Sequence, residues 1–222
     1  RLALARFYFI NGMPTEAASF WALAVRADPA LAEQPEYALV RAIAGLASGS
    51  LDESKAALAT LTTPTSDAAL WRGMVAVRER DWPTAQAQFR LGRDRMKDYP
   101  EPYLTRLQVA AIEAALNVSD TDTAAALLTT LTDRQRGLLQ HLTPAADYLT
   151  GLLDWQQNRS DEARAHFGSA AQSWDQLWRV RAELALIEAD IREGKASDAD
   201  ALRRLERLRF AWRGDALEFD ML

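Results

Sequence analysis

A small residue followed four positions later by a large, mostly apolar one recurs along this 222-residue chain. Residues four apart lie on one face of an α-helix, so each pair predicts a helix that packs through that face. Successive pairs begin 37, 31, 39, 39 and 36 residues apart, which is typical of a repeated helical unit. One such unit cannot bury its apolar face alone, so the repetition constrains the whole fold. The pairs are Ala17 and Trp21, Ser54 and Leu58, Ala85 and Phe89, Ala124 and Leu128, Ala163 and Phe167 and, more weakly, Ala199 and Arg203.

A preceding helix is expected in each unit, with a residue at the point where the two helices cross. Alanine or glycine there allows close approach, whereas isoleucine at two of the six positions predicts looser packing in the fourth and sixth units. No segment alternates with period two over a useful length, so the fold class is all-α. The six crossing positions are Ala5, Ala42, Gly73, Ile112, Gly151 and Ile187.

Turn residues divide the chain at the same places. Asn11-Gly12 predicts a helix end with a left-handed residue, and Pro14 suits the first turn of the next helix. Asp81 is a candidate cap for a helix in which Pro83 occupies an early position. Acidic residues open several second helices, where the positive end of the helix dipole stabilises them, so they do not indicate a catalytic pair.

Leu4, Ala5, Tyr8, Gly12, Ala17, Trp21, Ala24 and Pro29 together resemble one unit of the tetratricopeptide repeat family. The resemblance covers nearly the whole chain with declining quality, around a family period of about 34 residues. It implies an α-solenoid of about six helix-turn-helix repeats in a right-handed superhelix. It also implies a concave groove that binds a peptide or a protein surface.

We therefore predict one solenoid over the whole chain. Residues 60–66 are the most linker-like segment. The stretch from Leu131 to Pro144, which contains His141, has the composition of a loop, with room for a short extra helical turn. Both ends fall inside helical patterns, so we expect a piece of a longer protein. The predicted repeats span 1–30, 34–63, 66–98, 101–132, 144–172 and 175–208, and 215–222 begins a further helix.

Composition limits the partners and the location. A net charge of −5 argues against nucleic acid, and no apolar run is long enough to insert into a membrane. The absence of cysteine fits the cytoplasm and the periplasm equally. Residues 204–218 are similar to a stretch found between repeats in large bacterial tetratricopeptide proteins of the cell envelope, which slightly favours the periplasm or envelope.

Mapping the family's groove-facing positions onto this chain implies a mostly apolar wall with a few charges. Such a wall suits an amphipathic helix or an apolar peptide, although some of these residues could instead belong to the core. The family's carboxylate clamp is not supported, because only Arg6 among its matching positions could serve. The implied groove residues are Arg6, Phe9, Ile43, Met74, Val77, Arg78, Glu113, Tyr148, Leu152, Trp155, Glu188 and Arg192.

A second candidate surface lies on one predicted helix. Two tryptophans one turn apart, with an arginine after them, have the composition of an interface hot spot, although such a stripe more often packs against neighbouring helices. The residues are Trp174, Leu177, Trp178 and Arg181.

An enzyme is not expected. The two histidines, His141 and His166, do not have metal-ligand spacing, and His166 is interpreted as a solvated position. Carboxylates on predicted first helices keep an acid–base pair conceivable, but no phosphate loop, zinc motif or nucleophile elbow is present. These carboxylates are Glu113, Asp154, Glu188 and Asp190. We expect no cofactor and no metal.

Three functions remain open at this point. The favoured one is a protein-binding scaffold within a larger protein. The second is a structural or oligomerising arm whose groove is filled by its own side chains. The third is a helical accessory domain of a cell-wall enzyme. The sequence does not identify the partner or the oligomeric state.

Overall fold

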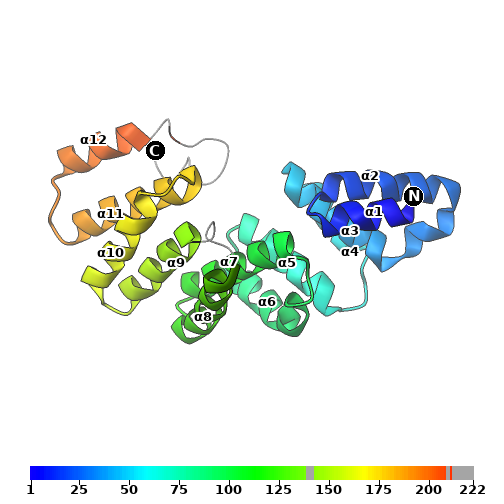
Figure 1. Cartoon of the computed structure of the whole chain (residues 1–222), viewed down its shortest axis with the longest axis horizontal. Coiled ribbons are helices and arrows are strands. Elements are labelled where there is room, and N and C mark those ends of the chain that lie inside the picture. Colours follow the sequence, from blue (N-terminus) through cyan, green and yellow to red (C-terminus); the bar gives the residue numbers. More distant parts are fainter. Residues whose placement is uncertain (139–142, 209–210, 212–222) are drawn as a thin grey trace. The chain divides into compact units, whose positions relative to one another are not determined.

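The computed structural model describes residues 1–138, 143–208 and 211. These residues form twelve α-helices and one short 3-10 helix, and no strand occurs among them, so the all-α prediction is confirmed. The chain divides into two compact parts, Arg1–Val118 and Ser119–Leu222, called here the N-terminal and C-terminal units (Figure 1). The division falls between the two helices of the fourth predicted repeat. The predicted helix start at 215–222 lies outside the described residues.

The N-terminal unit contains seven of these α-helices, and successive helices pack against each other in pairs joined by short turns. A 3-10 helix follows the second α-helix and is capped by Asp28. It accounts for part of the long spacing between the first two residue pairs. The elements are α1 (Leu2–Ile10), α2 (Pro14–Ala27), η1 (Pro29–Glu33), α3 (Pro35–Ser48), α4 (Leu51–Ala59), α5 (Ser66–Arg78), α6 (Trp82–Met96) and α7 (Glu101–Asn117).

The C-terminal unit contains the remaining five α-helices. Its best-packed pair is formed by the ninth and tenth helices, which also contact the eleventh. The elements are α8 (Thr121–Leu138), α9 (Thr143–Gln156), α10 (Ser160–Ala171), α11 (Gln176–Arg192) and α12 (Asp198–Leu208).

One backbone feature recurs in the turn inside every helix pair. Among the described residues, a positive φ occurs at six positions, and each of them stands five residues before the small residue of a repeated pair. This geometry ends the first helix and reverses the chain. Three of these residues are not glycine, so the turn keeps its positive φ even where the sequence lacks the glycine that usually adopts it. The values are 76° at Gly12, 81° at Gly49, 58° at Arg80, 60° at Ser119, 60° at Asn158 and 66° at Gly194.

The predicted crossing residues are all buried, and the two glycines among them each lie close to an aromatic ring. A Cβ on Gly73 would lie 3.0 Å from the Phe89 ring, and one on Gly151 would lie 2.6 Å from the Phe167 ring. The second-helix pairs are buried in the first five repeats. In the sixth, Ala199 and Arg203 are exposed and different residues of α12 face the core, so this pair departs from the pattern.

The prediction of a loop from Leu131 to Pro144 is wrong over most of this stretch. Helix α8 continues to Leu138, and Leu131 is completely buried within it. Threonines made this stretch resemble a loop, but the Thr132 hydroxyl donates a hydrogen bond to the Leu128 carbonyl 3.0 Å away and so remains compatible with a helix. His141 lies outside the described residues.

The first and seventh helices meet within the N-terminal unit. The rings of Phe9 on α1 and Tyr103 on α7 are stacked, with centroids 4.6 Å apart and planes 19° apart. A Cβ on Gly12 would lie 2.8 Å from the Pro102 Cβ, so the α1–α2 turn also touches the start of α7. In a simple repeat array each repeat contacts only its neighbours. This contact joins the first predicted repeat to the fourth, so the N-terminal unit departs from that rule.

Candidate protein-binding surface

One face of α9 carries three large side chains that are neither fully buried nor fully exposed. They are Tyr148, Leu152 and Trp155, and their spacing places them on a single side of the helix. Tyr148 contacts the core, because its ring centroid lies 6.0 Å from that of the buried residue Phe167 on α10. The face is therefore held in place by the packing of α9 against α10.

Helix α11 supplies the neighbouring half of this surface. Its Trp178 ring lies 5.7 Å from the Tyr148 ring, and its Arg192 guanidinium lies 6.0 Å from the centre of the Trp155 ring. Arg181 lies 5.0 Å from the centre of the Trp178 ring. Asp175 caps this helix by accepting a hydrogen bond from the Leu177 amide at 3.0 Å. The α9–α11 surface consists of Tyr148, Leu152, Trp155, Trp178, Arg181, Glu188 and Arg192.

The charges of this surface are arranged around its aromatic rings. Two arginines are placed over the two tryptophans, an arrangement that cation–π attraction favours, while the exposed Glu188 lies on the same helix. Guanidinium groups match carboxylates, and the rings offer apolar contact. The surface can therefore accept a segment that combines apolar side chains with an acidic group. Trp, Tyr and Arg are also the residues enriched at energetic hot spots of interfaces.

The structure joins two groups of residues that the sequence kept apart. Trp178 and Arg181, predicted as a separate surface, lie beside the predicted groove residues of α9. Trp174 is 76% exposed, while Leu177 packs onto the α11–α12 core. Sequence reasoning missed this grouping because it depends on how α9 and α11 cross.

The predicted groove residues of the N-terminal unit have mixed positions. Arg6 is exposed and binds Glu36 on α3, with its Nη2 3.0 Å from the carboxylate. Phe9 is covered by Tyr103, and Ile43 is only 2% exposed and lies in the core, where it cannot reach a ligand. The others are half-buried or exposed on α5 and α7: Met74, Val77 and Glu113 are half-buried, and Arg78 is exposed.

A histidine–carboxylate pair links α9 to α10. Asp154 is 3% exposed, and its Oδ2 lies 2.8 Å from Nδ1 of the half-exposed His166. The Nε of Arg159 donates a hydrogen bond to the other carboxylate oxygen at 3.1 Å. The interpretation of His166 as merely solvated missed this contact. The crossing of Gly151 with Phe167 is the signal that could have found it, because Asp154 lies one turn further along α9.

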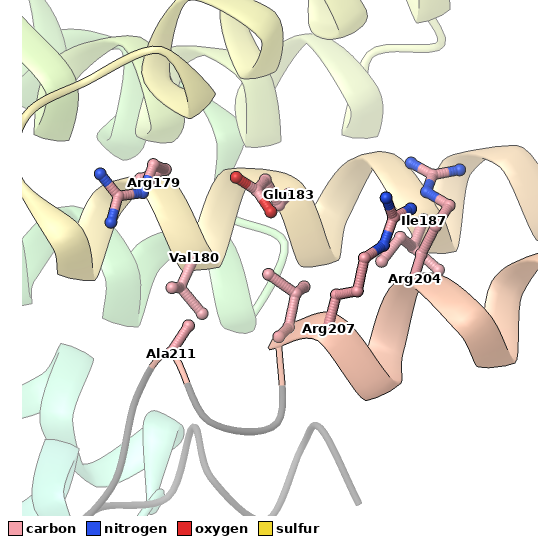
Figure 2. Close-up of a pocket in the computed structure, with 8 residues that line it drawn as sticks. Arg179, Val180, Glu183, Ile187, Arg204, Arg207 and Ala211 are labelled. Atoms are coloured by element: carbon pink, nitrogen blue, oxygen red, sulfur yellow. The ribbon is translucent and has the colours of Figure 1, made fainter.

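A concave region of about 310 Å³ lies between α11 and α12 (Figure 2). Its floor is apolar, with Val180, Ile187 and Leu208 almost fully buried. Arg204 and Arg207 extend from α12 toward α11 at its edge. Arg204 is already bound to the carboxylate of Asp190, which leaves its guanidinium less available for a ligand.

No three histidine, aspartate or glutamate side chains in the described part of the chain gather as a metal site. None of the described helices is both long and apolar enough to span a membrane. No protein-family model matches the chain, and no curated protein matches it either. The resemblance to tetratricopeptide repeats therefore depends on the residues of this chain alone.

Proposed function

We propose that this chain is a non-enzymatic scaffold of tetratricopeptide type, in which helical repeats form a solenoid that binds a peptide or protein segment. The α9–α11 surface is the proposed binding site. The observation that carries this proposal is the pairing of two half-buried tryptophans with two arginines beside Tyr148, on one face of two neighbouring helices. This combination is enriched where binding energy is concentrated.

The partner segment carries apolar side chains and at least one carboxylate. Apolar groups would pack on Tyr148, Leu152 and Trp155, and a carboxylate would bind the Arg192 guanidinium. The weaker resemblance of residues 204–218 supports a role within a larger bacterial protein of the cell envelope.

A displayed library of random twelve-residue peptides, selected against the whole chain, tests this proposal. Enriched peptides should combine aromatic or aliphatic residues with aspartate or glutamate. Trp155→Ala should weaken their binding by about 10- to 30-fold, which corresponds to about 1.4–2 kcal/mol for the loss of a hot-spot side chain. Fluorescence anisotropy of a labelled peptide measures the affinity.

Trp174→Ala is the matched control, because Trp174 is an exposed tryptophan outside the α9–α11 surface. Its substitution should leave the affinity unchanged. Equal losses for the Trp155 and Trp174 variants, or a library that yields no enriched peptide, would contradict the proposal.

The N-terminal unit favours the second candidate function, a structural arm. Of its predicted groove residues, Ile43 is buried in the core, and the half-buried Phe9 stacks on the chain's own Tyr103. If the whole chain were such an arm, Trp155→Ala would lower its stability and no selected peptide would depend on that residue. A combined measurement of melting temperature and peptide affinity therefore separates the two functions.

A further inference from the structure

We propose that the stacked pair Phe9–Tyr103 is a latch that holds two groups of helices together within the N-terminal unit. One group is α1–α4 and the other is α5–α7. The latch opens by rotation about residues 60–65, which connect α4 to α5. This inference concerns a conformational device and does not depend on binding at the α9–α11 surface.

The two groups are joined by two sets of contacts, and the first set includes the packing of α3 and α4 on α5. In this first set, α4 leads directly into the linker, and the Arg72 Nη2 on α5 donates hydrogen bonds to the carbonyls of Leu58 at 3.2 Å and Leu61 at 2.7 Å. In the second set, Phe9 stacks on Tyr103 and Gly12 touches Pro102. The first set of contacts forms a hinge and the second set forms a closure.

Each group has an apolar core of its own that does not require the closure. Helix α1 is held to α2 and α3 by the cluster of Ala5, Ala17, Trp21 and Val40. On the other side, Tyr103 packs edge-on against Trp71, with ring centroids 5.9 Å apart. Opening the latch therefore separates Phe9 from Tyr103 without dismantling either core.

The closed arrangement contains an unsatisfied polar group. Tyr103 is 1% exposed, and its hydroxyl is a buried side-chain atom without a hydrogen-bond partner. Burial raises the pKa of Tyr103 to about 12, against the opposing effect of Arg106 and with a contribution from Glu16 on α2. The Tyr103 side chain is thus enclosed partly by α1 and α2, the helix pair that carries Phe9.

Opposing effects decide the balance of the latch. A stacked aromatic pair favours contact by roughly a factor of up to ten in an equilibrium constant, in addition to the gain from the apolar surface that it buries, and a buried hydroxyl without a partner disfavours contact by about the same factor or more. Opening lets water reach the hydroxyl. Opening of the latch therefore restores the hydration of this hydroxyl and exposes Phe9 and Tyr103.

Tyr103→Phe tests the orphaned hydroxyl. Its removal should raise the melting temperature of the whole chain by about 2–4 °C. Tyr99→Phe is the matched control in the same aromatic cluster, because the Tyr99 hydroxyl accepts a hydrogen bond from Trp71 Nε1 at 2.9 Å and donates one to Asp67 at 2.9 Å. That substitution should lower the melting temperature. A lower melting temperature for Tyr103→Phe would overturn the proposal.

The opening itself is measured by spin labels in this cysteine-free chain. Cysteines placed at the exposed positions Asn11 and Arg106 carry the labels, one on each side of the closure. Tyr103→Phe should narrow the distribution of distances between the two labels toward the shorter distances of the closed form. Phe9→Ala should shift this distribution to longer distances. An identical distribution in the parent and in both variants would overturn the latch, provided that circular dichroism shows both variants folded.

Discussion

At the scale of single residues, Asp190 holds the last three helices together. Its carboxylate lies 2.8 Å from Arg164 on α10 and also binds Arg204 on α12, while its own backbone belongs to α11. Burial alone would raise the pKa of Asp190, but hydrogen bonds and attraction from the two arginines outweigh burial and lower the pKa below 3.8. Because the side chain is only 17% exposed, solvent screens these contacts less than it screens surface pairs.

This lowered pKa predicts how stability depends on pH. A carboxylate whose pKa is lower in the folded chain stabilises the fold above its unfolded value, and that contribution is lost as the pH falls through the folded value. Asp190→Asn should therefore lower the free energy of unfolding by about 1 kcal/mol at pH 6 and have a smaller effect below pH 3. Urea unfolding from pH 2 to pH 6 measures both.

Asparagine keeps the size of the aspartate side chain, so a difference between the two pH profiles reports the charge of the Asp190 carboxylate. A pH profile for Asp190→Asn that parallels the parent would show that the two arginines do not stabilise this carboxylate.

At the scale of helices and turns, the same local solution is used six times. A residue with positive φ ends the first helix each time, and in the first five repeats the small residue five positions later is buried and lets the second helix return against the first. Most of this was predictable, because capping and turn preferences act over a few residues. The continuation of α8 to Leu138 was not predictable, since packing of Leu131 overrides the weak helix preference of its threonines.

Two glycines in one helix pair predict opposite effects of the same substitution. Gly151→Ala should lower the free energy of unfolding by about 1–3 kcal/mol, because the new Cβ would lie 2.6 Å from the Phe167 ring. Gly168→Ala on α10 should raise it by up to about 1 kcal/mol, since nothing lies within 4 Å and alanine favours the helix. Chemical denaturation of both variants measures the difference. Equal effects would show that the close crossing does not limit packing.

At the scale of the whole molecule, the chain consists of two compact units with their own cores. In helical repeat chains stability is approximately a sum of local terms, and units can open separately. The contact between Phe9 and Tyr103 adds a long-range contribution to the stability of the N-terminal unit.

This division predicts which helices a destabilising substitution affects. Gly151→Ala, which lies in the C-terminal unit, should accelerate amide hydrogen exchange in α9 and α10 while leaving the exchange of α1–α7 unchanged. Hydrogen exchange followed by mass spectrometry locates the effect. A uniform loss of protection from α1 to α12 would indicate that the chain unfolds as one cooperative body.

The sequence alone determined that the chain is helical, where several of the turns between helices lie, and which residues occupy the close crossings. These properties follow from periodicity, capping and turn chemistry, which act between residues near each other in the chain. Only the tertiary structure decided that Phe9 meets Tyr103, that His166 meets Asp154, and that Tyr148 and Trp155 lie beside Trp178 and Arg192. Such contacts depend on the angle and rotation of each helix, and the summed packing of many side chains sets both.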